Sequence, residues 1–370
     1  MRAIIAGGGI VGLTTGLALK SMGADVVVCE QATEIRAAGA AIGLWENALD
    51  VFAEFGVGDA VRSIGAPIET WFYDASGNRF RAPGYGPAEH RFLLVPRPEL
   101  NRTLADAIGA DNIALDARVI GFEEDADGVT VRFGDGRTDR ADLLIGADGV
   151  YSMVREQLVP GYPARDHVGH HVWRGIVETG DEPAEGSVLT VGHHRTRGGY
   201  TPTYGGKTVW MVNQFDSAAP VDTHKREALR RASFMNDNGW GDPLNRLIER
   251  TPDSQILHNQ IMYVPELPRW SGARVTLIGD AAHGLSPHIS AGGTLGVEDV
   301  RVLIDRLRAH DRVADALKAY EGNRMPHYRH VHALAHAVEQ ARDAQEFARE
   351  YARFSRWMLT DGARHARQGE

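Results

Sequence analysis

The chain has 370 residues, 43% of them hydrophobic and 24% charged, which is enough for one large domain or two domains that share a boundary. Its net charge of −9 argues against a nucleic-acid partner, which calls for a basic surface, and favours a small-molecule partner. The single cysteine allows no intrachain disulfide, and without a leader or an apolar run of membrane length the sequence predicts a cytoplasmic protein with no membrane contact.

The first thirty residues predict a βαβ unit. Residues 3–6 form an apolar strand, "GGGIVG" at 7–12 a glycine turn, residues 10–22 a helix, and residues 25–29 a second strand that contains Cys29. The cysteine is expected to be a small buried side chain in that strand.

The glycine turn has the spacing of a dinucleotide-binding loop. Gly7 makes the tight turn, Gly9 lets the backbone approach a pyrophosphate, and Gly12 brings the helix close to the sheet. Glu30 follows the second strand, where a carboxylate accepts hydrogen bonds from ribose hydroxyls. These residues predict dinucleotide binding and leave open whether the ligand is NAD or FAD.

Downstream of Glu30 no second nucleotide motif follows, unlike in a dehydrogenase. A loop leads to a helix that ends near Phe55, and residues 111–155 then suggest a β-meander with turns "DADG" and "GDGR". The meander ends in the strand "ADLLIGADG", which places Asp148 at a strand end. The alternative reading of Asp148 is an exposed turn.

The middle of the chain predicts a mostly antiparallel sheet. Residues 68–96 and 160–265 are rich in β-branched and aromatic residues separated by glycine-containing turns. Large side chains available for a ring-binding pocket are Trp173, Tyr200, Tyr204, Trp210 and Met211. Since strand residues alternate between faces, only some of these point inward, and we select Tyr200 and Met211 as substrate contacts.

A second acidic and glycine-rich loop, "GDAAHGLSPHISAGG" at 279–293, follows the strand "ARVTLIG". Asp280 ends that strand, so its carboxylate is placed to bind the polyhydroxy chain of a flavin. Pro287 makes a rigid turn, and small residues then let helix N–H groups approach a ligand. His283 is expected to serve packing and hydrogen bonding.

The C-terminal part is predicted to be helical. Phe347, Tyr351, Phe354 and Met358 form one apolar stripe, which docks on the protein's own body or, alternatively, on a second copy. Phe354 or Trp357 is a candidate to close the active site. Four histidines in one helical stretch, His327, His330, His332 and His336, lack the pattern of a zinc site, and we expect no metal.

In three motifs the chain resembles the class A, single-component FAD-dependent aromatic hydroxylases of the p-hydroxybenzoate hydroxylase type. The motifs are "GGGIVG" with Glu30, "GADGVYSMVR" at 146–155 and "LIGDAAHGLSP" at 277–287. The resemblance implies an α/β fold: a Rossmann-like FAD-binding domain, an inserted mostly antiparallel substrate domain and C-terminal helices. The expected divisions are 1–67, 97–159 and 266–325 for the FAD-binding domain, 68–96 and 160–265 for the substrate domain, and 326–370 for a helical segment.

The resemblance also implies roles for individual residues. Gly9, Val11 and Glu30 contact the ADP part of a non-covalent FAD, Val119 borders the adenine, and Gly43 lies near the cofactor. Arg97 reaches the phosphates or ribityl chain, Asp280 binds the ribityl hydroxyls, and Gly292, Gly293 and Thr294 meet the pyrimidine edge. Asp148 and Gly149 correspond to a motif linked with the pyrophosphate and NAD(P)H. The chain has "SAGGT" where the family usually has a glutamine, which leaves Ala291 without that side chain.

The implied reaction is a monooxygenation. NAD(P)H reduces FAD, O₂ adds to give a C4a-hydroperoxide, and one oxygen atom passes to a small aromatic or N-heteroaromatic ring. No catalytic acid or base is identified. Pro287 and His288 are expected to contact substrate, although His288 is equally compatible with solvent exposure or a backbone hydrogen bond. "GAAIGLWENAL" resembles a segment of FAD-dependent urate hydroxylases, which makes urate and other N-heterocycles plausible substrates.

The sequence leaves other functions and the assembly open. A flavin-dependent reductase or dehydrogenase of the same fold and a non-catalytic flavin-binding protein are the alternatives. The assembly is expected to be a monomer or a homodimer.

Overall fold

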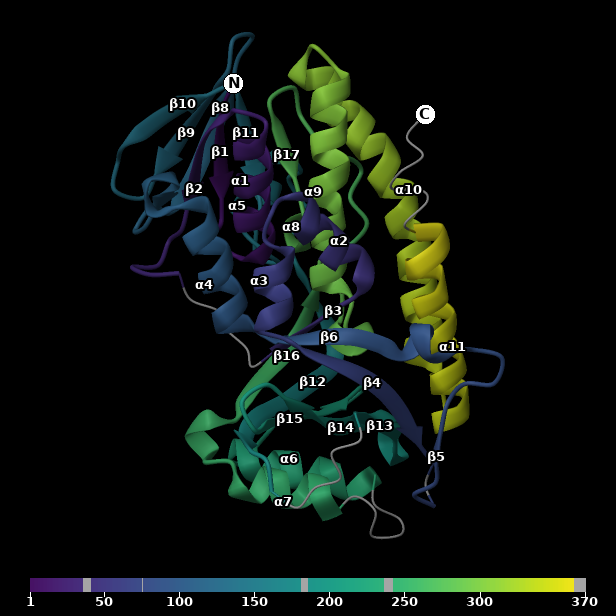
Figure 1. The fold of residues 1–370 in the computed structure, drawn as a ribbon. Coiled ribbons are helices and arrows are strands. Elements are labelled where there is room, and N and C mark those ends of the chain that lie inside the picture. The colour runs from purple at the N-terminus through teal and green to yellow at the C-terminus, as the bar shows by residue number, and fades with distance from the viewer. Residues whose placement is uncertain (36–40, 75, 181–185, 236–241, 363–370) are drawn as a thin grey trace.

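The fold joins a part built on a parallel sheet to a part built on a larger, mostly antiparallel sheet (Figure 1). The structure is a computed structural model, and it describes residues 1–35, 41–74, 76–180, 186–235 and 242–362. In the view of Figure 1 the parallel part lies above the large sheet, and the last two helices run along one side of both. The predicted fold class, a Rossmann-like domain with an inserted sheet and C-terminal helices, is confirmed.

The parallel sheet forms the centre of the first part. Its strands lie in the order β17 (Val275–Leu277), β11 (Leu143–Gly146), β1 (Arg2–Ala6), β2 (Asp25–Cys29) and β7 (Ile113–Ala114). The central strands read as unbroken apolar runs because both faces of the sheet are buried. Helix α1 (Ile10–Ser21) packs against α4 (Arg97–Ile108) and α9 (Gly292–Ala309).

A small antiparallel sheet lies beside the parallel one. It consists of β8 (Val119–Glu124), β9 (Val129–Phe133) and β10 (Thr138–Ala141), and α5 (Met153–Leu158) packs against β8. The predicted meander is thus confirmed for its middle. Its two ends, β7 and β11, instead pair with strands of the parallel sheet, because each lies beside a parallel strand from the N-terminus.

Over the described residues, the large sheet has nine strands. They follow the order β16 (Leu257–Tyr263), β12 (Arg165–Glu178), β15 (Lys207–Gln214), β14 (Thr196–Thr203), β13 (Ser187–Val191), β4 (Ala66–Tyr73), β6 (Arg91–Pro96) and β3 (Ala41–Leu44), with β5 (Arg79–Phe80) paired to β4. The predicted strands within 68–96 therefore do extend this sheet. Strand β3, from the segment assigned to the first part, pairs with β6 and continues the same sheet.

The two faces of the large sheet lie against different parts of the protein. One face is covered by α6 (His224–Ala232) and α7 (Asp242–Arg250) and encloses a second core that contains Trp173 and Trp210. The opposite face looks toward the parallel sheet. Strand alternation therefore decides which middle-segment side chains can meet a ligand between the sheets.

The remaining helices close the structure. They are α2 (Glu46–Glu54), α3 (Gly58–Ser63), α8 (Asp280–His283), α10 (Val313–Gln340) and α11 (Ala344–Trp357). Helix α10 packs against α9 and α11. Phe347, Tyr351, Phe354 and Met358 are all buried in the main core, so the apolar stripe docks on the protein's own body. Within the described ranges, every helix is too short or too polar to cross a membrane.

Candidate active site

A cavity of about 390 Å³ lies between the carboxyl ends of the parallel strands and the inner face of the large sheet. The glycine turn, the DG turn and the second glycine-rich loop contribute to its wall through Gly9, Gly149 and Gly292. Open α/β sheets bind ligands beyond the carboxyl ends of their strands, and this cavity has that position. Of the predicted cofactor residues, those in its wall are Gly9, Val11, Gly43, Arg97, Asp280, Gly292 and Gly293.

The nucleotide end is built by the turn after β1. Gly7 has a φ of +110°, and a Cβ on Gly12 would lie 1.9 Å from the Gly7 carbonyl oxygen, so both positions require glycine. A Cβ on Gly9 would meet no atom within 4 Å. The protein therefore leaves room at Gly9 for a ligand, as a pyrophosphate needs.

Glu30 follows β2 beside this turn. One carboxylate oxygen accepts a hydrogen bond from Gly8 N at 3.0 Å, and the other accepts one from Ala32 N at 2.9 Å. Each oxygen keeps a further lone pair, so the carboxylate remains able to accept ribose hydroxyls. Gly7, Gly12 and Glu30 thus shape the nucleotide end from behind the cavity wall.

The cavity wall contains a half-buried cation, Arg97, and an exposed carboxylate, Asp280. Arg97 is the first residue of α4, and its Nε is buried without a hydrogen-bond partner. Burial lowers the pKa of Arg97, while the neighbouring Asp280 opposes that shift. A guanidinium with an unsatisfied buried donor fits the phosphates or ribityl oxygens of FAD.

The DG turn is held by hydrogen bonds to the next helix. One oxygen of Asp148 accepts from Met153 N at 2.9 Å and Val154 N at 3.2 Å, while its other oxygen is buried without a partner. Burial raises the pKa of Asp148. Gly149, with a φ of +77°, lines the cavity in its place. Asp148 therefore positions the turn and retains one free acceptor.

The start of α9 lines the predicted flavin-ring end of the cavity. Gly292 and Gly293 line the cavity, and the backbone N–H groups of the first turn of this helix have no intrahelical partner. Thr294 is fully buried, and its hydroxyl accepts a hydrogen bond from Trp45 N at 3.1 Å. Thr294 thus ties α9 to the segment after β3. Val119 begins β8 and is buried in the main core.

A buried charge cluster supports the loop that presents Asp280. His283 Nε2 lies 2.6 Å from an oxygen of Asp299, which also accepts from Gly279 N at 3.1 Å. The other oxygen of Asp299 accepts from Arg324 Nε at 2.7 Å. Although burial acts to raise it, the charges of His283 and Arg324 keep the pKa of Asp299 below its ordinary value. The predicted packing role of His283 is confirmed, and the ring also stacks on Tyr328.

The wall formed by the large sheet follows one register row. Gly199, Met211 and Arg174 are paired across β14, β15 and β12, and side chains paired in this way share a face. All three residues line the cavity, and Met211 is the one that was predicted to contact substrate. Arg174, which sequence reasoning did not single out, is the charged member of the row.

The placement of Tyr200 corrects its expected role. Although Tyr200 belongs to the cavity wall, its side chain is buried in the second core with Trp173 and Trp210. Its strand position lies one residue from Gly199, which puts the aromatic ring on the other face of the sheet. Tyr204 is 59% exposed. The four aromatic candidates therefore do not present their rings to the cavity, and Met211 is the candidate that lines it with its side chain.

The expectation of a direct contact between His288 and substrate is also corrected. Pro287 lines the cofactor cavity, but His288 lines a second cavity and is buried. Its Nε2 lies 2.9 Å from the carbonyl oxygen of Ala335, the backbone alternative considered above. The turn at Pro287 directs the next side chain away from the cofactor cavity, while Ser286 borders both cavities.

The aromatic residue of α11 at the cavity is Tyr351, one turn before the expected Phe354. Phe354 packs edge-on against Trp45, with ring centroids 5.4 Å apart. No sequence signal separates the two residues, since both belong to the same apolar stripe. Arg174 and Tyr351 are among the cavity residues that the sequence motifs did not reveal.

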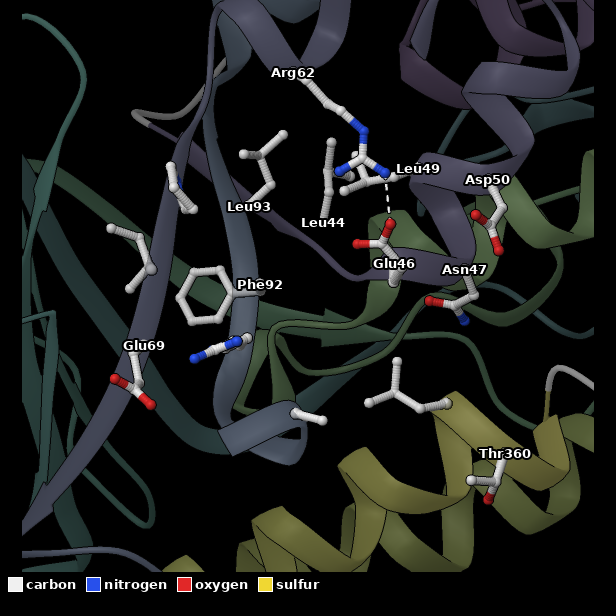
Figure 2. Close-up of a pocket in the computed structure, with 15 residues that line it drawn as sticks. Leu44, Glu46, Asn47, Leu49, Asp50, Arg62, Glu69, Phe92, Leu93 and Thr360 are labelled. Carbon is white, nitrogen blue, oxygen red and sulfur yellow. Dashed lines mark hydrogen bonds and ion pairs between the residues drawn. The ribbon is translucent and has the colours of Figure 1, made fainter. Parts of the chain in front are cut away.

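A larger cavity, of about 890 Å³, lies on the other side of β6 (Figure 2). It is bounded by α2, β4 and β6, and its polar residues include Arg62 and Glu46, which form an exposed ion pair at 2.5 Å. None of the glycine-rich loops reaches it, so the motif residues favour the smaller cavity as the candidate cofactor site. Among the residues that the structure describes, no group of His, Cys, Asp or Glu side chains is arranged to hold a metal ion.

Known proteins resemble this chain over nearly its full length. The sequence model of the family described as FAD binding domain matches residues 1–335. The FAD-dependent urate hydroxylase of Klebsiella pneumoniae subsp. pneumoniae is 34% identical over 333 residues, which cover 88% of this chain and 86% of the relative. The aurachin C monooxygenase/isomerase of Stigmatella aurantiaca is 32% identical over 332 residues, which cover 88% and 85%.

A solved structure agrees with these sequence relatives. Klebsiella pneumoniae HpxO in complex with FAD and uric acid superposes with a TM-score of 0.82 at 30% identity, covering 98% of this chain and 95% of that one.

Proposed function

Because this chain belongs to the FAD binding domain family, among the class A FAD-dependent aromatic hydroxylases, we propose that it hydroxylates a small, planar, negatively charged ring. The family match and the relatives confirm the enzyme class that the three motifs predicted, an FAD-dependent monooxygenase. The proposal concerns the substrate, which we place between the cofactor and the inner face of the large sheet.

The observation that carries the proposal is Arg174. Its guanidinium lines the cavity and donates to Asn259 Oδ1 at 2.7 Å, while its Nε is buried without a partner. None of the described carboxylates forms an ion pair with it. Burial, and then the charge of Arg97, lower the pKa of Arg174. Arg174 is half-buried, and a partly desolvated cation without a counter-charge is unfavourable, so an anionic ligand would relieve that cost.

Uric acid fits this chemistry. It is the ligand of the HpxO complex, and it is a planar N-heteroaromatic ring that is anionic at neutral pH. In this chain the register partners of Arg174 are Met211 and Gly199, of which the glycine leaves space and the methionine an adaptable apolar surface. We therefore extend the proposal to urate and to aromatic carboxylates and phenolates of similar size.

When bound, FAD accepts a hydride from NAD(P)H and, once reduced, activates O₂. The protein's own residues orient and shield the reactants. The N–H groups at the start of α9 favour negative charge at the pyrimidine edge, because they lie at the positive end of a helix dipole. Val172, Leu189 and Met211 of the sheet and Tyr351 of α11 give the cavity apolar walls that exclude water.

The test is a comparison of ring substrates. The purified protein is loaded with FAD, and NAD(P)H consumption is measured with the anionic rings urate, salicylate and 4-hydroxybenzoate and with the neutral rings phenol and caffeine. We expect anionic rings to accelerate consumption and to carry one ¹⁸O atom after turnover under ¹⁸O₂. Reduction without ¹⁸O incorporation would instead support a reductase, and preference for neutral rings would contradict the proposal.

Arg174→Gln provides the residue-level test. Removing the guanidinium is expected to weaken binding of the anionic ring by about 10- to 100-fold, the range for hydrogen bonds to charged groups. Arg132→Gln, which changes a 47% exposed arginine on β9 of the small sheet, is the matched control. Equal effects of the two variants would show that Arg174 is not the anion contact.

A further inference from the structure

Ser286 lies at the junction of two cavities. It and Leu285 line both the cofactor cavity and a second cavity of about 450 Å³, which is bordered by His167, His288 and Glu339. The serine is buried, and its hydroxyl is within hydrogen-bond distance of two histidines: His288 Nδ1 at 2.8 Å and His170 Nδ1 at 3.1 Å.

The proton positions of this group follow from its geometry. His288 Nε2 faces the carbonyl oxygen of Ala335, which can only accept, so Nε2 carries a proton. Burial lowers the pKa of His288 to about 4, so at neutral pH the ring is neutral and its Nδ1 is an acceptor. Ser286 therefore donates its only hydroxyl proton to His288.

His170 must then be the donor to Ser286. With the hydroxyl proton already used, the 3.1 Å contact is satisfied only if His170 Nδ1 carries a proton and donates it to Ser286 Oγ. Burial lowers the pKa of His170 to about 2, so this ring is neutral as well, and its Nε2 is buried without a partner. The charged and titratable groups that act on the two rings are Arg197, Glu339 and His167.

In this network the Ser286 hydroxyl can only accept a further hydrogen bond. A hydroxyl oxygen accepts two hydrogen bonds, and His170 uses one of them. We propose that Ser286 is a specificity-determining residue that accepts a hydrogen bond from an N–H, NH₂ or O–H group of the bound ring. Resting on the proposed function, this narrows the substrate to an anionic ring that also carries a donor.

Arg174 and Ser286 thus require complementary hydrogen-bonding groups on the ligand. The guanidinium has only donors, and the serine, as held by the two histidines, has only an acceptor. A ring with acceptors alone satisfies Arg174 and leaves the Ser286 oxygen without a donor, which is unfavourable in a buried site. Urate, with ring N–H groups, and 2-hydroxy- or 2-aminobenzoates satisfy both.

The first experiment measures equilibrium binding to the FAD-loaded protein without NAD(P)H, from the change in flavin absorbance. Salicylate is compared with benzoate and 2-methoxybenzoate, and urate with its N-methylated derivatives. We expect wild-type protein to bind the donor-bearing ring about tenfold more tightly or better, and Ser286→Ala to lose that preference. Ser233→Ala, a hydroxyl deletion at an exposed position outside both cavities, is the control that keeps it.

His288→Phe is expected to reverse the preference of Ser286 for a donor on the ring. Without the imidazole acceptor, the Ser286 hydroxyl is free to donate, so this variant is expected to gain affinity for 2-methoxybenzoate relative to salicylate. ¹⁵N chemical shifts of labelled histidines provide a second measurement, assigned with His170→Phe and His288→Phe. We expect the Nδ1–H form for His170 and the Nε2–H form for His288, and the opposite tautomers would overturn the proposal.

The outcomes separate the two proposals. If anionic rings bind and wild type prefers none of the donor-bearing ones, the role of Ser286 is wrong and the proposed function stands. If neutral rings bind and anionic rings do not, the proposed function is wrong, and the substrate class argued for Ser286 falls with it.

Discussion

A methyl group at Gly9 would separate the requirements of the fold from those of the cofactor. Gly9 has a φ of −80°, which any residue adopts, and a Cβ there would touch no protein atom within 4 Å. We expect Gly9→Ala to fold like wild type while its affinity for FAD falls at least about tenfold, because the methyl group enters the space left for the pyrophosphate.

The measurement for Gly9→Ala is flavin fluorescence quenching during titration of the apoprotein, together with its thermal unfolding without FAD. Gly322→Ala, whose Cβ also meets no atom within 4 Å, is the control and should bind FAD normally. Unchanged FAD affinity in Gly9→Ala would place the cofactor elsewhere.

Single residues were predictable where their signal is local. Gly9, Asp280 and Gly292 line the cavity because short motifs that follow strands fix both their identity and their position. The partner of Ser286, His170, lies 116 residues earlier, and no local pattern connects the two. For Arg174, "HVWRGIVE" contains nothing that separates an arginine facing a cavity from one facing solvent.

Helices α9 and α10 are joined by buried charges. Arg324, on α10, is fully buried, pairs with Asp299 and lies 3.8 Å from Glu298, both on α9. Arg324→Ala would leave the buried Glu298 without its paired cation and Asp299 with His283 alone. We expect it to lower the free energy of unfolding by about 3–5 kcal/mol, as measured by urea denaturation.

Arg329→Ala, on the same helix, is the control for Arg324→Ala. The Arg329 pair with Glu266 is 59% and 61% exposed, so its loss should cost less than about 1 kcal/mol. Similar losses in the two variants would mean that the buried cluster contributes no more than a surface pair.

A second link, between β12 and α10, predicts a pH dependence. His167 Nε2 and a carboxylate oxygen of Glu339 are 3.0 Å apart. The Glu339 hydrogen bond raises the pKa of His167 above 6.5, against the effect of burial. Although burial acts to raise it, the His167 hydrogen bond lowers the pKa of Glu339 from 4.5 to about 2.

The histidine contributes its full stability below pH 6.5 and loses it as pH rises through its raised folded pKa. The carboxylate contributes fully above pH 4.5 and loses its contribution as pH falls toward about 2. The stability difference between wild type and Glu339→Gln should therefore be largest between pH 4.5 and 6.5. Urea denaturation across a pH series measures it, with Glu266→Gln as an exposed control, and a flat difference would exclude this pair.

Elements were predictable in proportion to their regularity. The strand Asp25–Cys29 and the helix after Gly9 have the predicted bounds to within one residue, because their apolar periodicity is unbroken. Strands β3 and β7 have four and two residues, too few to show a period. Their pairing depends on partners elsewhere in the chain, which only the assembled sheet provides.

At the scale of the whole molecule, the order of motifs predicted the fold class, while the contents of the space between the two sheets required the structure. Parity along β14 and β15 decides that Met211 faces the cavity and the Tyr200 ring does not. Parity is fixed by register, and a shift of one residue would reverse it. Sequence alone leaves that register undetermined in long strands that are buried on both faces.

Cys29 makes this protein suited to a measurement that needs no engineered residue. It is the only cysteine in the chain, it is 3% exposed in β2, and burial raises its pKa to about 12. Its carbonyl oxygen accepts a hydrogen bond from Gly7 N at 2.8 Å, so the thiol becomes reactive when the first βαβ unit opens.

Thiol labelling therefore reports how often the nucleotide end opens. FAD binds the closed unit and should slow labelling in proportion to its saturation, whereas a ring substrate alone should not. Equal labelling rates with and without FAD would mean that the cofactor leaves this end of the molecule untouched. One thiol, placed under the adenosine end by the second strand, thus separates cofactor-linked opening from motion at the distant ring site.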